Sequence, residues 1–119
     1  MHVLVTGATG KVGQALIGRL ASERPQVRIR ALCHNRTLAE TEQLSVVRGS
    51  IAERETCRRA LDGITHVVHL ATCKETPEDV MDVTVRGLFW LLEEFRTSPT
   101  AERFVLIGGR NLSEVSRLP

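Results

Sequence analysis

The 119-residue chain contains no tyrosine, a single tryptophan and three phenylalanines. The absence of tyrosine excludes any chemistry within this chain that needs a phenol as acid, base or nucleophile. Basic residues are not clustered or interleaved with aromatic ones, and the formal net charge is only +2. The sequence therefore predicts no nucleic-acid partner.

Long apolar runs are also missing. No stretch approaches the roughly 20 residues that a membrane-crossing helix needs, and the chain opens on a strand pattern rather than a signal region. We therefore expect no membrane partner and a cytoplasmic location. The three cysteines, an odd number without C-x-x-C spacing, are predicted to be reduced and mostly buried: Cys33, Cys57 and Cys73.

A strand, a glycine-rich turn and a helix occupy the first part of the chain. The aliphatic and β-branched run His2–Thr6 is typical of a strand buried on both faces. Three glycines follow at intervals of three residues: Gly7, Gly10 and Gly13. Helical spacing then begins, with one apolar face predicted to contain Val12, Ala15, Leu16 and Leu20.

This order of elements favours a phosphate site at the turn. A helix N-terminus offers unpaired N–H groups and the positive end of the helix dipole to an anion. A side chain at Gly7 or Gly10 would block the phosphates, and the absence of one at Gly13 would let the helix lie close to the strands. The alternative is a strand–helix joint whose glycines only ease packing.

The rest of the chain alternates between strand and helix patterns. Further strands are predicted at residues 27–33, 44–48, 65–70 and 103–107. Further helices are predicted at residues 37–43, from a Thr37-x-x-Glu40 capping box, and at 53–61 and 76–96. Five strands alternating with four helices predict a parallel sheet of order 3-2-1-4-5, with a ligand at the carboxyl ends of strands one and four.

The glycine spacing after Val5 and Thr6 resembles that of the short-chain dehydrogenase/reductase superfamily. Segments 49–51, 60–71 and 104–107 narrow the resemblance to its extended or atypical type, the NAD(P)-dependent epimerases and dehydratases. The resemblance implies an α/β fold, a Rossmann-type doubly wound sheet truncated after strand five. It covers only the amino-terminal half of such an enzyme, with an NAD(P)-binding domain at residues 1–109 and an irregular tail at 110–119.

A dinucleotide, NADP or NAD, is the cofactor that the resemblance implies. It places around that cofactor Gly7, Thr9, Gly10, Lys11, Val12, Gly13, His34, Arg36, Ser50, Ile51, Ala71 and Thr72. NAD-preferring relatives carry an acid after strand two, whereas the stretch 33–36 here has no carboxylate. Basic groups suit a ribose 2′-phosphate, so the resemblance favours NADP, with His34 and Arg36 as contacts. Alternatively, Arg36 is simply a solvated charge.

Several positions depart from the family pattern. Ser50 replaces an acid that holds the adenine amine, Thr84 replaces an asparagine, and Gly108–Gly109 replaces small hydroxyl residues after strand five. The family transfers hydride with the help of a tyrosine and a lysine four residues on, whose charge lowers the tyrosine pKa. Without tyrosine the chain cannot contain this pair, so no catalytic residue is predicted in it.

Other polar clusters carry no predicted chemistry. His66 and His69, three apart on one strand, point to opposite faces, so no metal site is expected. Glu93 and Glu94 are predicted on the solvent side of a helix.

Three functions remain open: the nucleotide-binding part of an oxidoreductase or epimerase, a non-catalytic nucleotide-sensing module, and an interaction domain with an empty glycine turn. A homo-oligomer through the apolar stripe Val80–Phe95, with Phe89 and Trp90 beside it, is also predicted.

Overall fold

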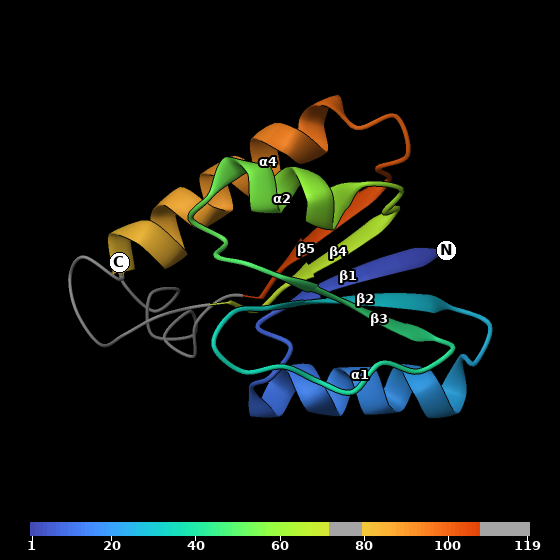
Figure 1. The fold of residues 1–119 in the computed structure, drawn as a ribbon. Helices are drawn as coiled ribbons and strands as arrows, with labels where there is room; N and C mark the ends of the chain where they lie inside the picture. Colours follow the sequence, from blue (N-terminus) through green and yellow to red (C-terminus); the bar gives the residue numbers. More distant parts are fainter. Residues whose placement is uncertain (72–79, 108–119) are drawn as a thin grey trace, which may run out of the picture.

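The computed structural model describes residues 1–71 and 80–107 and shows a parallel sheet between two helical layers (Figure 1). The strands are β1 (His2–Thr6), β2 (Arg28–Cys33), β3 (Leu44–Arg48), β4 (His66–His69) and β5 (Arg103–Leu106). Their order is β3-β2-β1-β4-β5, and all four pairings are parallel. The sheet order and the fold class predicted from the sequence are confirmed.

Helices cover both faces of this sheet. Helix α1 (Lys11–Glu23) lies on one face, and α2 (Arg54–Leu61) and α4 (Gly87–Thr97) lie on the other (Figure 1). A π-helical segment, η1 (Val80–Arg86), runs directly into α4. The predicted helix start at residues 76–79 lies outside the described residues. Across residues 1–71 and 80–107, no helix is long and apolar enough to span a membrane.

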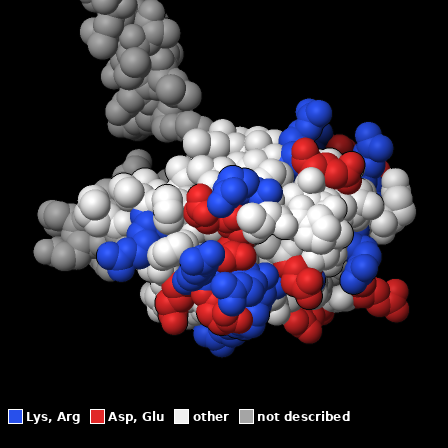
Figure 2. All heavy atoms as spheres, turned by 90° about the horizontal axis from the view of Figure 1, so that it is seen from above, with Lys and Arg blue, Asp and Glu red and all other residues white. Residues whose placement is uncertain are grey.

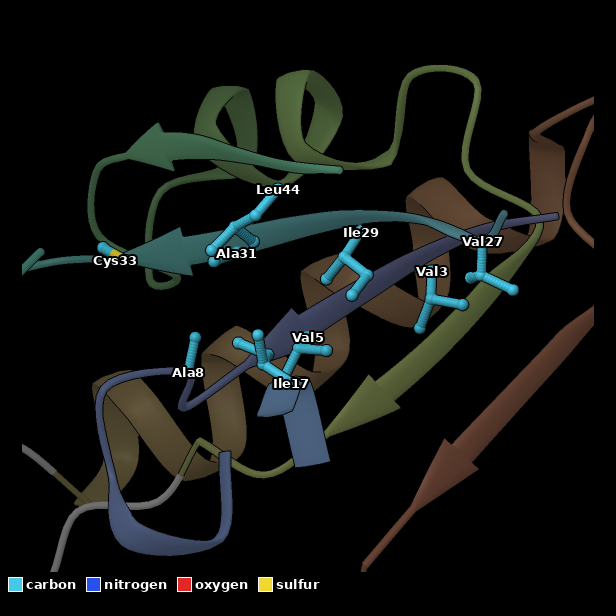
Figure 3. Close-up of a cluster of buried hydrophobic side chains, with 9 residues drawn as sticks. All are labelled: Val3, Val5, Ala8, Ile17, Val27, Ile29, Ala31, Cys33 and Leu44. Carbon is cyan, nitrogen blue, oxygen red and sulfur yellow. The ribbon is translucent and has the colours of Figure 1, made fainter. Parts of the chain in front are cut away.

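Both faces of β1 are buried, as its unbroken apolar run predicts. Val3 and Val5 face α1 and pack with Ile17 of that helix (Figure 3). Leu4 points to the opposite face, into a second cluster that includes Leu61 of α2 and Leu91 of α4. The central strand is thereby fixed from two sides, and its carboxyl end is held at one edge of the sheet.

The helix predicted at residues 37–43 is absent, and the capping-box interpretation was wrong. Residues 37–41 have no regular secondary structure, and the Glu40 carboxylate accepts the Val46 N–H at 3.0 Å instead of reaching back to Thr37. The Thr41 hydroxyl likewise accepts the N–H groups of Gln43 and Leu44. These side chains bind the backbone at the edge strand β3 and the turn before it, so contacts with the sheet replace the local helix signal.

The apolar face of α1 differs from the prediction at two positions. Its buried residues are Gly13 and Ile17, with Leu16 and Leu20 beside them, whereas Val12 is 64% exposed and Ala15 is exposed as well. Val12 belongs to the first turn of α1, directly after the glycine at the N-cap and Lys11.

Glu94 is not on the solvent side, contrary to the prediction. Its carboxylate accepts a 2.8 Å hydrogen bond from Arg54 of α2 and lies 3.5 Å from Arg58, and its side chain is 12% exposed. The hydrogen bond from Arg54 lowers the pKa of Glu94. Arg54 also lies over the Trp90 ring, 5.1 Å from its centroid. Acidic and basic side chains are intermixed on this helical side of the molecule (Figure 2).

Candidate functional site

A cleft of about 400 Å³ opens where the strands end. Its lining comes from the ends of β1 and β2 and from the loops that follow β1, β2, β3 and β4: Thr6, Gly7, Thr9, Leu32, His34, Asn35, Arg36, Gly49, Ser50, Ile51 and Ala71. This edge is the one at which doubly wound sheets bind ligands.

The N-terminus of α1, next to the cleft, is uncapped and carries no negative charge. The N-cap residue Gly10 has no side chain, and no side-chain hydrogen bond caps the helix. No acidic residue lies in the first turn, which begins with Lys11. Within residues 1–71 and 80–107, the amides of Lys11, Val12 and Gly13 donate no backbone hydrogen bond. Free N–H groups, the helix dipole and a lysine together favour negative charge here.

The three glycines have three different roles. A Cβ at Gly13 would lie 2.3 Å from the Gly7 carbonyl oxygen and 2.8 Å from Ala8 Cα, so Gly13 permits the first turn of α1 to pack on the preceding loop. Gly7 has a φ of +66°, and its Cβ would lie 2.8 Å from the Leu70 carbonyl carbon. The sequence predicted steric access for phosphate at Gly7, and the structure adds close packing against the end of β4.

Gly10 is the one glycine of the turn that the protein's own packing does not require. A Cβ there would make only an ordinary contact, 3.4 Å from the Gly7 carbonyl oxygen, and its φ of −76° suits any residue. The space above Gly10 is therefore available to a ligand at the helix N-terminus.

The loop after β2 reaches across to the glycine turn. Arg36 donates from Nη2 to the Thr9 carbonyl oxygen at 2.6 Å, and Gln14 donates to the same oxygen at 2.7 Å. Arg48 of β3 donates to the His34 carbonyl oxygen at 3.2 Å. Arg36 is exposed, but these contacts place its guanidinium beside the turn and argue against a purely solvated charge.

The structure brings most of the predicted site residues to this cleft. Those that line it are Gly7, Thr9, His34, Arg36, Ser50, Ile51 and Ala71. Those at the start of α1, beside the lining residues, are Gly10, Lys11, Val12 and Gly13. Thr72 lies outside the described residues.

Four lining residues were missed by the sequence analysis: Thr6, Leu32, Asn35 and Gly49. Thr6 is the last residue of β1 and Leu32 the next to last of β2, so their positions at strand ends were the available signal. Asn35 lies between two predicted residues, and Gly49 follows the last residue of β3 and precedes Ser50. Among the described residues, no group of three or more histidine, cysteine or acidic side chains could hold a metal ion.

Comparison with known proteins identifies a family and several relatives that the chain resembles. The family model described as "NAD dependent epimerase/dehydratase family" matches residues 3–113. A (4-alkanoyl-5-oxo-2,5-dihydrofuran-3-yl)methyl phosphate reductase of Streptomyces griseus is 39% identical over 77 residues, covering 65% of this chain and 27% of that protein. Dihydroflavonol 4-reductase of Zea mays is 30% identical over 132 residues, covering 97% of this chain and 37% of that protein.

Solved structures share the fold. A mutant of uronate dehydrogenase from Agrobacterium tumefaciens, complexed with NAD, has a TM-score of 0.81 at 23% identity, and the match covers 91% of this chain and 40% of that one. The Bordetella bronchiseptica enzyme WbmG, in complex with NAD, has a TM-score of 0.76 at 24% identity, and the match covers 89% of this chain and 36% of that one. The chain thus spans only 27–40% of the length of these four proteins.

Proposed function

Because the chain belongs to the NAD dependent epimerase/dehydratase family, we propose that its cleft binds NAD(P), with the pyrophosphate at the start of α1. The observation that carries this proposal is the uncapped, acid-free N-terminus of α1, whose N-cap position is left without a side chain although the packing would tolerate one. The adenosine part then lies against the loops after β2 and β3, where Ser50 and Ile51 line the cleft.

The activity of the whole protein is part of the same proposal. Named relatives are reductases, and fold neighbours are dehydrogenases, which supports an oxidoreductase or epimerase rather than a non-catalytic sensing module. Since this chain has no tyrosine, we assign cofactor binding to it, in residues 1–109, and no proton transfer. A cytoplasmic location belongs to this proposal as well and rests on the sequence alone.

The substitution Gly10→Ala tests the proposed pyrophosphate site at the start of α1. The new methyl group occupies the approach to the helix N-terminus but makes only ordinary contact with the protein. Since each tenfold in affinity corresponds to about 1.4 kcal/mol, the loss of well-placed phosphate contacts is expected to weaken binding by about tenfold or more. Titration of wild type and variant with NADPH, followed by nicotinamide fluorescence, measures the effect.

The thermal midpoint serves as the control in that experiment. We expect it to be unchanged in Gly10→Ala without ligand, which separates lost binding from lost folding. No binding of NADPH or NADH by the wild type, or equal affinity of the variant, would contradict the proposed function.

Preference for NADP over NAD is the finer part of the proposal. The stretch after β2 offers Arg36 and His34 and no carboxylate that would repel a 2′-phosphate. The hydrogen bond to Thr9 holds the Arg36 guanidinium beside the cleft, where a charge-assisted bond to phosphate can form with little rearrangement.

Arg36→Ala is expected to weaken NADP binding by about tenfold and to leave NAD binding within about twofold, because only NADP carries the 2′-phosphate. Arg19→Ala is the matched control: it removes the same charge from an exposed site on α1, where Arg19 pairs with Glu23. Calorimetric titration with both nucleotides gives the ratio of variant to wild-type affinity for NADP and the same ratio for NAD. Equal losses for NADP and NAD would show that Arg36 does not select the phosphate.

A homo-oligomer through the η1–α4 side is also proposed. Met81, Val85, Phe89 and Leu92 are 44–58% exposed and follow one another at helical spacing. Trp90, in contrast, packs against the buried cluster under α2 and α4 and contacts Arg54, so it does not belong to the exposed stripe. Sedimentation at tens of micromolar is expected to show a dimer or larger species, and Phe89→Ser is expected to shift it toward monomer. Monomer alone in the wild type would exclude the oligomer.

A further inference from the structure

The Thr6 hydroxyl, at the end of β1, has three hydrogen-bonding partners and no access to water. Its oxygen lies 2.7 Å from His69 Nδ1 on the neighbouring strand β4. It also accepts the backbone N–H groups of Leu70 at 3.0 Å and Ala71 at 3.2 Å. Thr6 is fully buried and His69 is only 3% exposed, so solvent cannot replace the contact between these two side chains.

Counting protons fixes the direction of the third contact. A hydroxyl has two lone pairs and one proton. The lone pairs are used by the two N–H groups, and the proton is therefore donated to His69 Nδ1. The imidazole must accept at Nδ1, so the neutral ring carries its proton on Nε2. Burial lowers the pKa of His69 from 6.5 to about 4, which keeps the ring neutral in this arrangement near neutral pH.

The Thr6 hydroxyl holds part of the cleft wall: of the two residues whose amides it accepts, Ala71 belongs to the cleft lining and Leu70 directly precedes it. Ala71 lines the cleft together with Thr6 and Gly7. On the other side, the backbone of Leu70 and Ala71 lies against Gly7, close enough that a Cβ there would be 2.8 Å and 2.9 Å away. The segment is therefore held by hydrogen bonds to the Thr6 hydroxyl and by packing, with its backbone against Gly7 and its side chains against the two hydrophobic clusters.

We propose that His69 is a positioning residue for the dinucleotide site: by accepting the Thr6 proton at Nδ1, it directs the hydroxyl lone pairs onto the amides of Leu70 and Ala71. Without an acceptor at this position the buried hydroxyl must satisfy its proton elsewhere, and one or both amides lose their partner. The role rests on the proposed function, since the wall that is positioned belongs to the proposed NAD(P) cleft.

The test compares two substitutions of similar size. His69→Leu removes the acceptor, while His69→Asn keeps an acceptor oxygen near the place of Nδ1. We expect His69→Leu to weaken NADPH binding by about three- to tenfold, the range for one hydrogen bond, and His69→Asn to stay within about twofold of wild type. Thr6→Val is expected to match His69→Leu, and the double variant to be little worse than either, because both act through one hydroxyl.

Two measurements that need no ligand accompany the titrations. Hydrogen exchange at the Leu70 and Ala71 amides is expected to accelerate in His69→Leu and not in His69→Asn. The imidazole nitrogen shifts of the wild type are expected to show Nδ1 as the unprotonated nitrogen, and a protonated Nδ1 would overturn the proposal even if His69→Leu fails to fold.

Equal weakening by His69→Asn and His69→Leu would overturn the proposal, because it would assign the effect to ring packing. Unchanged binding in His69→Leu, or losses that multiply in the double variant, would overturn it too. Failure of the wild type to bind any dinucleotide would instead overturn the proposed function, and the exchange and nitrogen-shift results would still decide whether His69 orients the Thr6 hydroxyl.

Discussion

Gly13→Ala is expected to lower the free energy of unfolding by about 3 kcal/mol, at the upper end of the range for overpacking. The added Cβ would lie 2.3 Å from the Gly7 carbonyl oxygen and within 3.0 Å of the Ala8 backbone. No side-chain rotation relieves a clash with backbone, so the first turn of α1 has to move away from the loop that precedes it. That displacement carries the helix N-terminus with it, and dinucleotide binding is expected to fall below detection.

Gly18→Ala in the same helix is the matched control. A Cβ at Gly18 has no neighbour within 4 Å, and the position is exposed. Helix propensity alone favours alanine over glycine by up to about 1 kcal/mol at either position. Urea unfolding is therefore expected to show opposite signs for the two substitutions. A stabilised Gly13→Ala would mean that the close approach of α1 to its loop does not exist in solution.

The sheet could be predicted from the sequence because each strand is a short apolar run that can be recognised from its own residues. His2–Thr6 reads as buried on both faces without knowledge of any partner, and alternation with helices then restricts the strand order. The prediction of a helix at residues 37–43 was wrong for the opposite reason, because the local pattern did not determine the structure there. Thr37 and Glu40 have the spacing of a helix cap, but Glu40 instead binds the N–H of Val46 on β3, and nothing in a local pattern reveals that partner.

The candidate site likewise has features that the sequence predicts and features that it does not. Glycine spacing was visible in the sequence, and so was the absence of an acid after β2. The contacts that hold individual residues at the site could not be inferred from the sequence. Gly7 is close to Leu70, Arg36 donates to Thr9, and Thr6 meets His69, contacts that join residues 27 to 63 positions apart. Such contacts form only when parallel strands bring their carboxyl ends together, so the fold has to be known before they can be inferred.

Acidification is expected to destabilise the protein between pH 6.5 and about 4, through histidines that are buried in the neutral form. Burial lowers the pKa of His69 from 6.5 to about 4. Burial first, and then the charges of Arg30 and Arg28, lower the pKa of His2 to about 4 as well. In this pH window the unfolded chain binds protons that the folded chain does not, so the stability present above pH 6.5 is lost as the pH falls.

His69 alone is expected to account for a loss of about 2–3 kcal/mol across that window, since one pKa unit corresponds to about 1.4 kcal/mol. Urea unfolding at a series of pH values measures the slope. His69→Asn, which does not titrate, is expected to flatten the curve and to leave only the part due to His2. The ion pair of Glu94 with Arg54 acts separately, because a lowered carboxyl pKa costs stability only at more acidic pH. If His69→Asn keeps the wild-type slope, the imidazole titrates as freely in the folded chain as in the unfolded one, and its ring cannot be the buried acceptor of the Thr6 proton.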